Sequence, residues 1–419
     1  MPLELLTRSS ESTEIPSPNP SFDCDVAIVG AGIVGATLAA ALKNSGMKVM
    51  LIEAQSQSTA AARQQVYAIS ILSGQIFQEL GIWDKILPKI QTFTKIHLSD
   101  ADYPGVVQFK PQDLNRDALG YVGEHRVLIS ALQEFLNECP HVTWVCPAEV
   151  VNVNYREDCV EIRVKFEGEM RLIRSKLLVA ADGAGSPIRQ AAGIKTHGWK
   201  YWQSCITTCI KPEKSHDSIA YERFWPSGPL AILPLPGNFC NIVWTAPHQE
   251  AKALMELDDE EFLAELSRRY GNQMGRLELV GKRSLFQVQL MQSDRYVLPR
   301  LALIGDAAHC CHPVGGQGLN LGIRDAAALA QVLQNANASG KDIGSLSVLL
   351  EYQRWRQLEN LTILGFTDFL VRIFSNNWFP LVVLRRLGLW MLRNIQPFKV
   401  FALRLMTGLL GRAPQIDQR

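Results

Sequence analysis

The sequence has almost no net charge, no long apolar runs and no second cysteine pair that would complete a metal site with Cys205 and Cys209. Among its 419 residues, 42 lysines and arginines balance 41 aspartates and glutamates, so no general attraction to nucleic acid is expected. No uncharged apolar run reaches the roughly 18 residues that can span a bilayer. The nine cysteines are scattered, which disfavours a zinc centre and suits a reducing compartment. We therefore expect a cytoplasmic protein without a metal or a nucleic-acid partner.

The two ends of the chain each lack one kind of residue. Residues 1–22 have no apolar segment typical of a secretory signal and are rich in serine, proline and glutamate, so a flexible tail is predicted. Residues 369–416 contain no acidic residue, whereas seven basic residues lie among many apolar and aromatic ones. Basic amphipathic helices of this kind suit an anionic membrane surface, and we predict peripheral membrane contact through residues 370–412. A helical cap on the core or a dimer contact are the alternatives, and the oligomeric state stays open.

The clearest motif is an apolar strand near the N-terminus that runs into a glycine-rich turn and a helix. Gly30, Gly32 and Gly35 have dinucleotide-binding spacing, which allows a tight turn, close approach to a pyrophosphate and close helix packing. Glu53 ends the second strand, where it can accept a hydrogen bond from a ribose hydroxyl. The alternative is a turn that only packs a helix on a sheet. Because the motif occurs once, a second dinucleotide would have no Rossmann domain of its own.

Two later apolar strands also end in an acidic residue beside a glycine. The first ends in Asp182-Gly183 and the second in Gly305-Asp306. In a doubly wound fold the carboxyl ends of the strands face the ligand, so both acids are candidate binding groups. For Asp182 a helix cap and turn is the alternative.

A loop with three glycines, Gly315, Gly316 and Gly318, follows the second of these strands. Backbone without side chains can approach a flat ring closely, so the loop is a candidate ring-binding site. The loop also holds His309 and His312, three residues apart. It offers no acidic ligand beyond the preceding aspartate, so a metal site there is disfavoured.

The remaining strand patterns predict the domain organisation. Three short strand-like runs between residues 141 and 166 suggest a small inserted sheet, and residues 196–292 are rich in short, turn-bounded strands that favour an antiparallel sheet. This second sheet is expected to shape a substrate pocket. The predicted units are a tail (1–22), a nucleotide-binding domain with a small inserted sheet (23–195), a β-rich substrate domain (196–292), a return to the first domain (293–340) and a C-terminal helical region (341–419).

Taken together, the three glycine and aspartate motifs resemble those of the group A flavoprotein aromatic hydroxylases, which have the fold of para-hydroxybenzoate hydroxylase. Their order and spacing match from about residue 25 to 333. Within that group the chain looks most like the ubiquinone-biosynthesis hydroxylases, on the stretches 222–224, 228–236, 243–245 and 312–325. The resemblance implies an α/β fold: a Rossmann-like FAD-binding domain of the glutathione-reductase type, an inserted, mostly antiparallel substrate sheet and a C-terminal helical segment.

The resemblance also implies an activity and a set of cofactor contacts. The family hydroxylates a polyprenylated phenol with bound FAD, transient NAD(P)H and O2, through a flavin C4a-hydroperoxide. One departure is that the arginine usual just before Ala-Leu-Ser is missing before Ala68-Ile69-Ser70, where the nearest arginine is Arg63. The implied contacts are Gly30, Gly32, Gly35, Glu53 and Arg126 with the ADP half, Gly305 and Asp306 with the ribityl chain, Asp182 and Gly183 near the flavin and nicotinamide route, and Gly315, Gly316, Gln317, Gly318, Leu319 and Asn320 around the flavin ring.

Several choices remain open at this point. No general base for the phenol can be named, and Tyr221, His248 and Tyr296 are candidates that are as readily structural. The alternatives to a hydroxylase of a lipophilic phenol are a hydroxylase of a small soluble aromatic, a flavin-dependent reductase of prenyl chains, and a non-catalytic flavoprotein of a quinone-synthesising assembly. The substrate ring and the choice between NADH and NADPH are not encoded in any motif.

Overall fold

The computed structural model describes residues 22–101, 103 and 105–416, so the tail predicted over residues 1–22 lies outside it except for Phe22. The first unit is the expected βαβ, made of β1 (Cys24–Val29), α1 (Ile33–Ala41) and β2 (Val49–Ile52). Strands β1 and β2 are parallel neighbours. Their side chains and almost all of those of α1 are buried, which is why this segment of the sequence is so apolar.

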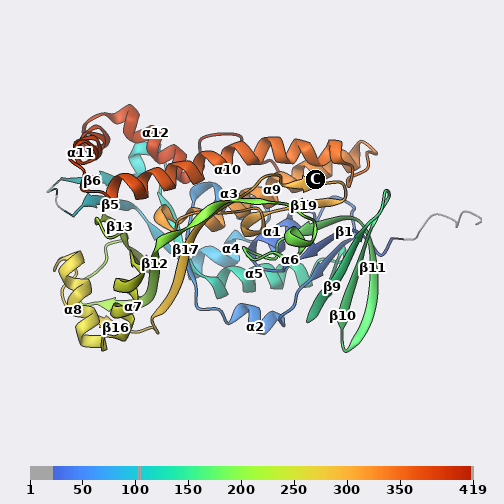
Figure 1. The fold of residues 1–419 in the computed structure, drawn as a ribbon, viewed down its shortest axis with the longest axis horizontal. Coiled ribbons are helices and arrows are strands. Elements are labelled where there is room, and N and C mark those ends of the chain that lie inside the picture. Colours follow the sequence, from blue (N-terminus) through green and yellow to red (C-terminus); the bar gives the residue numbers. More distant parts are fainter. Residues whose placement is uncertain (1–21, 102, 104, 417–419) are drawn as a thin grey trace, which may run out of the picture.

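The first sheet is built around these two strands (Figure 1). Its main order is β18, β19, β11, β1, β2 and β8. Neighbouring strands from β19 to β8 in this order are parallel. Strand β11 is long enough to pair with β1 near its end and with β10 along its first part. The strands expected to form a separate inserted sheet therefore belong to this sheet instead. The new strands are β8 (Val142–Val145), β9 (Ala148–Tyr155), β10 (Val160–Phe166), β11 (Glu169–Ala180), β18 (Val297–Leu298) and β19 (Leu301–Leu303).

The second sheet is mostly antiparallel, as expected, and α7 (His248–Glu256) and α8 (Asp259–Tyr270) pack on it. Its order is β20, β17, β12, β15, β14, β13, β5 and β6, with β16 beside β12. Strands β5 and β6 come from within residues 23–195, and β5 pairs in parallel with β13. The strands are β5 (Lys95–Asp100), β6 (Val106–Phe109), β12 (Thr196–Pro212), β13 (Ile219–Phe224), β14 (Leu230–Leu235), β15 (Phe239–Pro247), β16 (Leu277–Leu279), β17 (Ser284–Ser293) and β20 (His309–Cys310).

Four long helices complete the molecule. Helix α9 (Gln317–Ala338) packs against α1, and α10 (Leu346–Phe374) runs along the top of the molecule in Figure 1. Helices α11 (Phe379–Asn394) and α12 (Gln396–Thr407) lie beyond the end of α10, beside β5 and β6. A buried ion pair of 2.7 Å between Arg385 Nε and Asp100 Oδ2 attaches α11 to β5. The C-terminal region is therefore helical, as predicted.

Shorter elements connect these layers. A three-stranded sheet in the order β3, β7, β4 carries the segment around Ala68 on β3. Within the described residues, each helix is too short or too polar to cross a bilayer. The shorter elements are β3 (Val66–Ile69), β4 (Gln91–Phe93), β7 (Gly120–Glu124), α2 (Gln57–Ala61), α3 (Ile71–Glu79), α4 (Trp83–Ile86), α5 (His125–Asn137) and α6 (Pro187–Ala191).

Candidate active site

The three glycines of the first turn are required for different physical reasons. Gly30 has φ +97°, and a Cβ there would lie 2.3 Å from the carbonyl oxygen of Ala181. A Cβ on Gly35 would lie 2.0 Å from the carbonyl oxygen of Gly30. Beside Gly32 there is open space, and no side chain caps α1. The first N–H groups of α1 are therefore available to a phosphate.

A cavity of about 480 Å³ opens beside this turn. Of the predicted residues, Gly30, Gly32, Glu53, Asp182 and Gly183 line it, whereas Gly35 lies beneath the turn. The Glu53 carboxylate accepts from the backbone N–H of Ala31 at 2.8 Å and closes one end of the turn. A single cavity thus collects residues from the ends of three strands.

Asp182 carries an oxygen that no group satisfies. Its Oδ1 is buried and has no hydrogen-bond partner among the described residues. Burial raises the pKa of the Asp182 carboxyl, while hydrogen bonds from Ser186 and from backbone N–H groups act in the opposite direction. An unsatisfied buried oxygen in a cavity wall is suited to a ligand that brings a donor.

The cavity has a different arginine from the one expected. The Arg126 guanidinium binds Glu124 at 2.6 Å, its side chain is 70% exposed, and it does not line the cavity. Arg63 does line it, together with His125. The arginine usual just before Ala68-Ile69-Ser70 is absent, and Arg63 is the arginine nearest to that segment in the sequence. Arg63 therefore provides an arginine in the cavity wall, although at a different position.

The turn at Gly305 and Asp306 joins β19 of the first sheet to β20 of the second, and neither residue lines the first cavity. Gly305 has φ +58°, and a Cβ there would lie 3.2 Å from the Val34 side chain on α1. The Asp306 side chain is exposed to solvent. The protein packed around it nevertheless raises the pKa of its carboxyl by desolvation, and the charge of His309 acts in the opposite direction. Burial and the Asp306 charge raise the pKa of Tyr67 to about 12, which places Tyr67 near Asp306.

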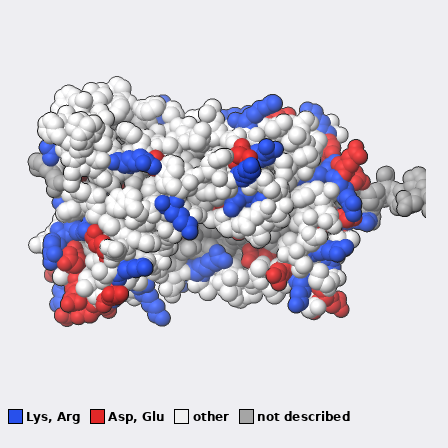
Figure 2. All heavy atoms as spheres, viewed as in Figure 1, with Lys and Arg blue, Asp and Glu red and all other residues white. Residues whose placement is uncertain are grey.

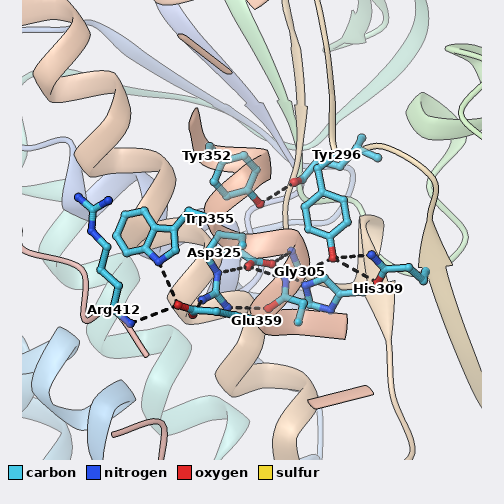
Figure 3. A network of polar contacts seen from close by, with 12 residues as sticks. Tyr296, Gly305, His309, Asp325, Tyr352, Trp355, Glu359 and Arg412 are labelled. Carbon is cyan, nitrogen blue, oxygen red and sulfur yellow. Dashed lines mark hydrogen bonds and ion pairs between the residues drawn. The ribbon is translucent and has the colours of Figure 1, made fainter. Parts of the chain in front are cut away.

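A buried polar network holds this turn in place (Figure 3). Asp325 on α9 accepts from the Gly305 N–H at 3.1 Å, from His309 Nε2 at 2.6 Å and from Arg356 Nε at 2.8 Å. Burial alone would raise the pKa of Asp325, but the charges of His309 and Arg356 outweigh it and lower that pKa. Arg356 also binds Glu359. The network fixes the Asp306 turn from behind, and no sequence motif predicted it.

A second cavity, of about 180 Å³, lies at the glycine loop that follows. Three walls form it: the loop with the segment around Ala68, the face of the second sheet, and helices α10, α11 and α12. Most of the lining side chains are apolar, and Glu222 is the one charged side chain among them. The lining includes Ala68, Ile69, Ser70, Ile96, Leu98, Phe109, Glu222, Phe224, Gly315, Gln317, Asn320, Phe366, Leu370, Leu392, Leu403 and Met406.

Side-chain amides fix the glycine loop between these walls. Asn320 Nδ2 donates to the carbonyl oxygen of Ala68 at 2.9 Å, and Gln317 Nε2 donates to the carbonyl oxygen of Met406 at 3.1 Å. A Cβ on Gly315 would lie 2.2 Å from Met406 Cε, so α12 sits directly against the loop.

The other predicted loop residues lie around this point. Gly316 has φ +61° and approaches the Ala68 side chain, and the space beside Gly318 is open. Leu319 is half-buried and packs on the core of the first sheet. His312 Nδ1 accepts from the Val314 N–H, and burial lowers the pKa of His312 to about 3. His312 and His309 thus have different partners.

None of the three candidate bases lines either cavity. Tyr221 packs edge-on against Tyr270 on the far side of the second sheet, His248 Nδ1 lies 2.5 Å from Ser204 Oγ, and Tyr296 is fully buried. Sequence reasoning did not name Glu222 as a functional residue. One signal was present, because strand alternation puts residue 222 on the same face as the apolar residues 220 and 224.

The chain's own features fit FAD. The open space beside Gly32 and Gly183, the uncapped N-terminus of α1 and the unsatisfied oxygen of Asp182 suit a pyrophosphate and its sugars. Asp306 lines neither cavity, but its charge acts on Tyr67, which lies in sequence between Arg63 of the first cavity and Ala68 of the apolar one. Backbone of the glycine loop borders the apolar cavity, where a flat ring can lie.

Known proteins resemble this chain along most of its length. The FAD binding domain family model matches residues 23–358. Ubiquinone hydroxylase UbiL of Rhodospirillum rubrum is 36% identical, over 93% of this chain and 91% of its own. The 3-demethoxyubiquinol 3-hydroxylase of Escherichia coli is 34% identical, over 92% and 98%. An uncharacterized protein of Synechocystis sp. is 52% identical, over 94% and 95%.

A solved structure has the same fold. The p-nitrophenol 4-monooxygenase PnpA of Pseudomonas putida superposes with a TM-score of 0.77, over 93% of this chain and 98% of its own, at 18% identity. At that identity the likeness concerns the fold alone. On the family model and the relatives above 30% identity, the chain belongs to the family of FAD-dependent hydroxylases that includes those of ubiquinone biosynthesis.

Proposed function

We propose that this FAD-dependent monooxygenase hydroxylates a polyprenylated phenol of quinone biosynthesis, using NAD(P)H and O2. The observation that carries the proposal is the apolar cavity at the glycine loop, roofed by α10, α11 and α12. A small aromatic acid would need a cationic partner, and no lysine or arginine lines this cavity. The names of the relatives supply the quinone pathway, since two are hydroxylases of ubiquinone or its precursor.

The chain's residues divide the work of holding the cofactor. Gly32, Glu53 and Arg63 would bind the ADP half, Asp306 the ribityl chain, and the backbone at Gly315 the ring. FAD, when bound, takes hydride from NAD(P)H and activates O2 for transfer to the substrate. The apolar lining excludes water from the ring, which protects the reactive state from hydrolysis and breakdown.

The outer surface of the roof supports a membrane location for the substrate. Several large side chains there are exposed: Phe379 at 76%, Trp378 at 65% and Trp390 at 50%. On the face drawn in Figure 2, the region over α11 and α12 carries few charged side chains. The same helices line the apolar cavity from inside, so a prenyl chain could extend between cavity and membrane without crossing a polar surface. We infer that the protein docks on anionic membrane by this face.

Charge-bearing substitutions on this face are expected to weaken membrane binding. Introducing Phe379→Glu together with Trp390→Glu should lower partition into vesicles containing phosphatidylglycerol by at least about tenfold, because two aromatic side chains no longer enter the interface. Sedimentation with vesicles measures this. Met170→Glu is the matched control, since Met170 is 58% exposed on the β10–β11 hairpin at the far end of the molecule. Equal loss in both variants would contradict the assigned face.

The proposed activity is tested with the purified holoenzyme and a short prenylated phenol, 2-geranylphenol. We expect NAD(P)H-dependent consumption of one O2 per product and a product one oxygen atom heavier. A product with a saturated prenyl chain and no O2 uptake would instead identify a reductase. Bound FAD without NAD(P)H oxidation in the presence of any phenol would instead favour the non-catalytic flavoprotein.

A further inference from the structure

Glu222 is a carboxylate set in an apolar wall. It lies on β13, opposite Leu98 of β5 and Ala231 of β14. Strand alternation places it between the buried side chains of Ala220 and Phe224, on the face that lines the apolar cavity. Its neighbour Arg223 points to the other face and donates to the carbonyl oxygen of Tyr270.

Three of the other polar side chains of this cavity have protein partners, whereas Gln317 donates through Nε2 but has a buried Oε1 without a partner among the described residues. Asn320 binds the backbone of Ala68 and Gly316, and Ser70 Oγ accepts from the Ser73 N–H. Thr407 Oγ1 donates to the carbonyl oxygen of Leu403. A donor on a bound molecule would therefore find two free acceptors, the neutral amide oxygen of Gln317 and the carboxylate of Glu222, and only the carboxylate can take up a proton.

Within the described part of the chain, no hydrogen bond or ion pair engages the Glu222 carboxylate. The charges on the surrounding elements are committed elsewhere: Arg385 to Asp100, and Asp368 to Arg372 and to the Tyr201 hydroxyl. The thiol of Cys205 on β12 is buried and its pKa is raised to about 12, so it brings no charge. An unpaired carboxylate in apolar surroundings costs stability, which makes it a candidate functional group.

Burial also moves the acidity of Glu222 toward that of a phenol. The pKa of its carboxyl is raised from 4.5 to about 8. A phenol has a pKa of about 10, and a proton moves most readily between groups of similar pKa. An ordinary surface glutamate would be a much weaker acceptor for the same proton.

We propose that Glu222 is the group that accepts the proton of the ring hydroxyl of the bound phenol. In this step the O–H bond of the phenol breaks, a carboxylate oxygen forms the new O–H bond, and the electron pair stays on the ring oxygen. No oxidant or reductant is needed. The phenolate so formed is more electron-rich at its ring carbons, which favours attack on activated oxygen. The inference rests on the proposed function.

Ligand binding tests the contact without requiring turnover. Holoenzyme is titrated with 2-geranylphenol and with its methyl ether, which cannot donate a hydrogen bond. At pH 9 the wild type should bind the phenol at least about tenfold more tightly, as expected for a hydrogen bond to a charged acceptor. Glu222→Leu should reduce that preference to within about twofold. Glu278→Gln, an exposed glutamate on β16 of the same sheet, is the control and should keep the preference.

The pH profile separates proton transfer from a purely structural role. Glu222 must be ionised to act, so wild-type hydroxylation should rise as the pH rises through about 8. Glu222→Gln keeps the shape but cannot take the proton. The variant should hydroxylate at least about 100-fold more slowly and show no such rise with pH. It should retain FAD, and its NAD(P)H oxidation should yield hydrogen peroxide instead of product.

Stability gives an independent readout of the same carboxyl. Because its pKa is raised in the folded protein, ionisation of Glu222 destabilises the fold increasingly as the pH rises above 4.5. The melting temperature of Glu222→Gln should therefore exceed that of the wild type by an amount that grows toward pH 8.

The outcomes are distinguishable. A Glu222→Gln enzyme with wild-type rate and pH profile, or a Glu222→Leu enzyme with the wild-type ligand preference, would overturn the role of Glu222 and leave the proposed function intact. A wild-type enzyme that consumes no O2 with any prenylated phenol would overturn the proposed function. In that case the ratio of phenol to methyl ether binding still decides whether Glu222 engages a hydroxyl.

Discussion

Replacing Asp325 with asparagine should lower the free energy of unfolding by about 3–5 kcal/mol, because the buried guanidinium of Arg356 loses its fully buried counter-charge and keeps only the partly exposed Glu359. Both side chains are fully buried. The same change removes a strong acceptor of the Gly305 N–H, so the Asp306 turn should loosen and the purified protein should carry much less FAD. Urea denaturation and the ratio of flavin to protein absorbance measure the two effects.

An exposed ion pair provides the control. Asp259→Asn makes the same chemical change in a pair with Arg283, where the aspartate is 68% exposed, and should cost less than about 1 kcal/mol without loss of FAD. Because the folded-state pKa of Asp325 lies below its ordinary value of 3.8, its contribution is present above that pH and is lost as the pH falls further. Similar stabilities for the two variants at pH 7 would refute the importance assigned to the network.

Alanine at Gly35 and at Gly32 should disable FAD binding in two different ways. At Gly35 the added Cβ would lie 2.0 Å from a backbone oxygen, so α1 must move from the sheet, at a cost of about 1–3 kcal/mol or more. At Gly32 nothing lies within 4 Å of the Cβ, so the apoprotein should lose only about 1 kcal/mol, the usual cost of alanine at the N-cap of a helix. In both variants FAD affinity should fall by at least about tenfold.

Thermal unfolding of apoprotein and FAD titration separate these two effects. Gly365→Ala on α10 serves as the control, because its Cβ also meets nothing and alanine favours a helix by roughly 1 kcal/mol. Normal FAD affinity in Gly32→Ala would show that the open space beside the turn does not receive the pyrophosphate.

The parts of the fold that were predictable from sequence are those fixed by neighbours in the chain. Gly30 and Gly35 constrain one turn, and the apolar strand before them must be buried on both sides. The class of fold and the helical C-terminal region followed from such local patterns and from the order of the motifs, and both are confirmed. Arg126 was expected at the ADP half from the family resemblance, whereas in the structure the neighbouring Glu124 binds its guanidinium at 2.6 Å.

The cavity walls could not be predicted because their contacts join distant parts of the chain. Asn320 binds Ala68 across 252 positions, and Met406 reaches the loop at Gly315 from the last helix. Pairing of β5 with β13 was hidden for the same reason, since nothing in either strand specifies a partner more than 100 residues away. An acidic residue on a predicted strand, such as Glu222, is not by itself a sign of function. Its apolar surroundings, which make it a candidate functional group, come from distant parts of the chain.

Helices α11 and α12 of the cavity roof are synthesised after the segments that surround the cofactor site. Residues 24–53 and 305–320, which surround the cofactor site, leave the ribosome before α11 and α12 do. Because domains fold as units from the N-terminal side during synthesis, the nascent chain presents its FAD site while the cavity is still open. Met406 can close against Gly315 only after α12 has been made, and a chain truncated near residue 375 would keep α10 but lack the α11 and α12 parts of the roof.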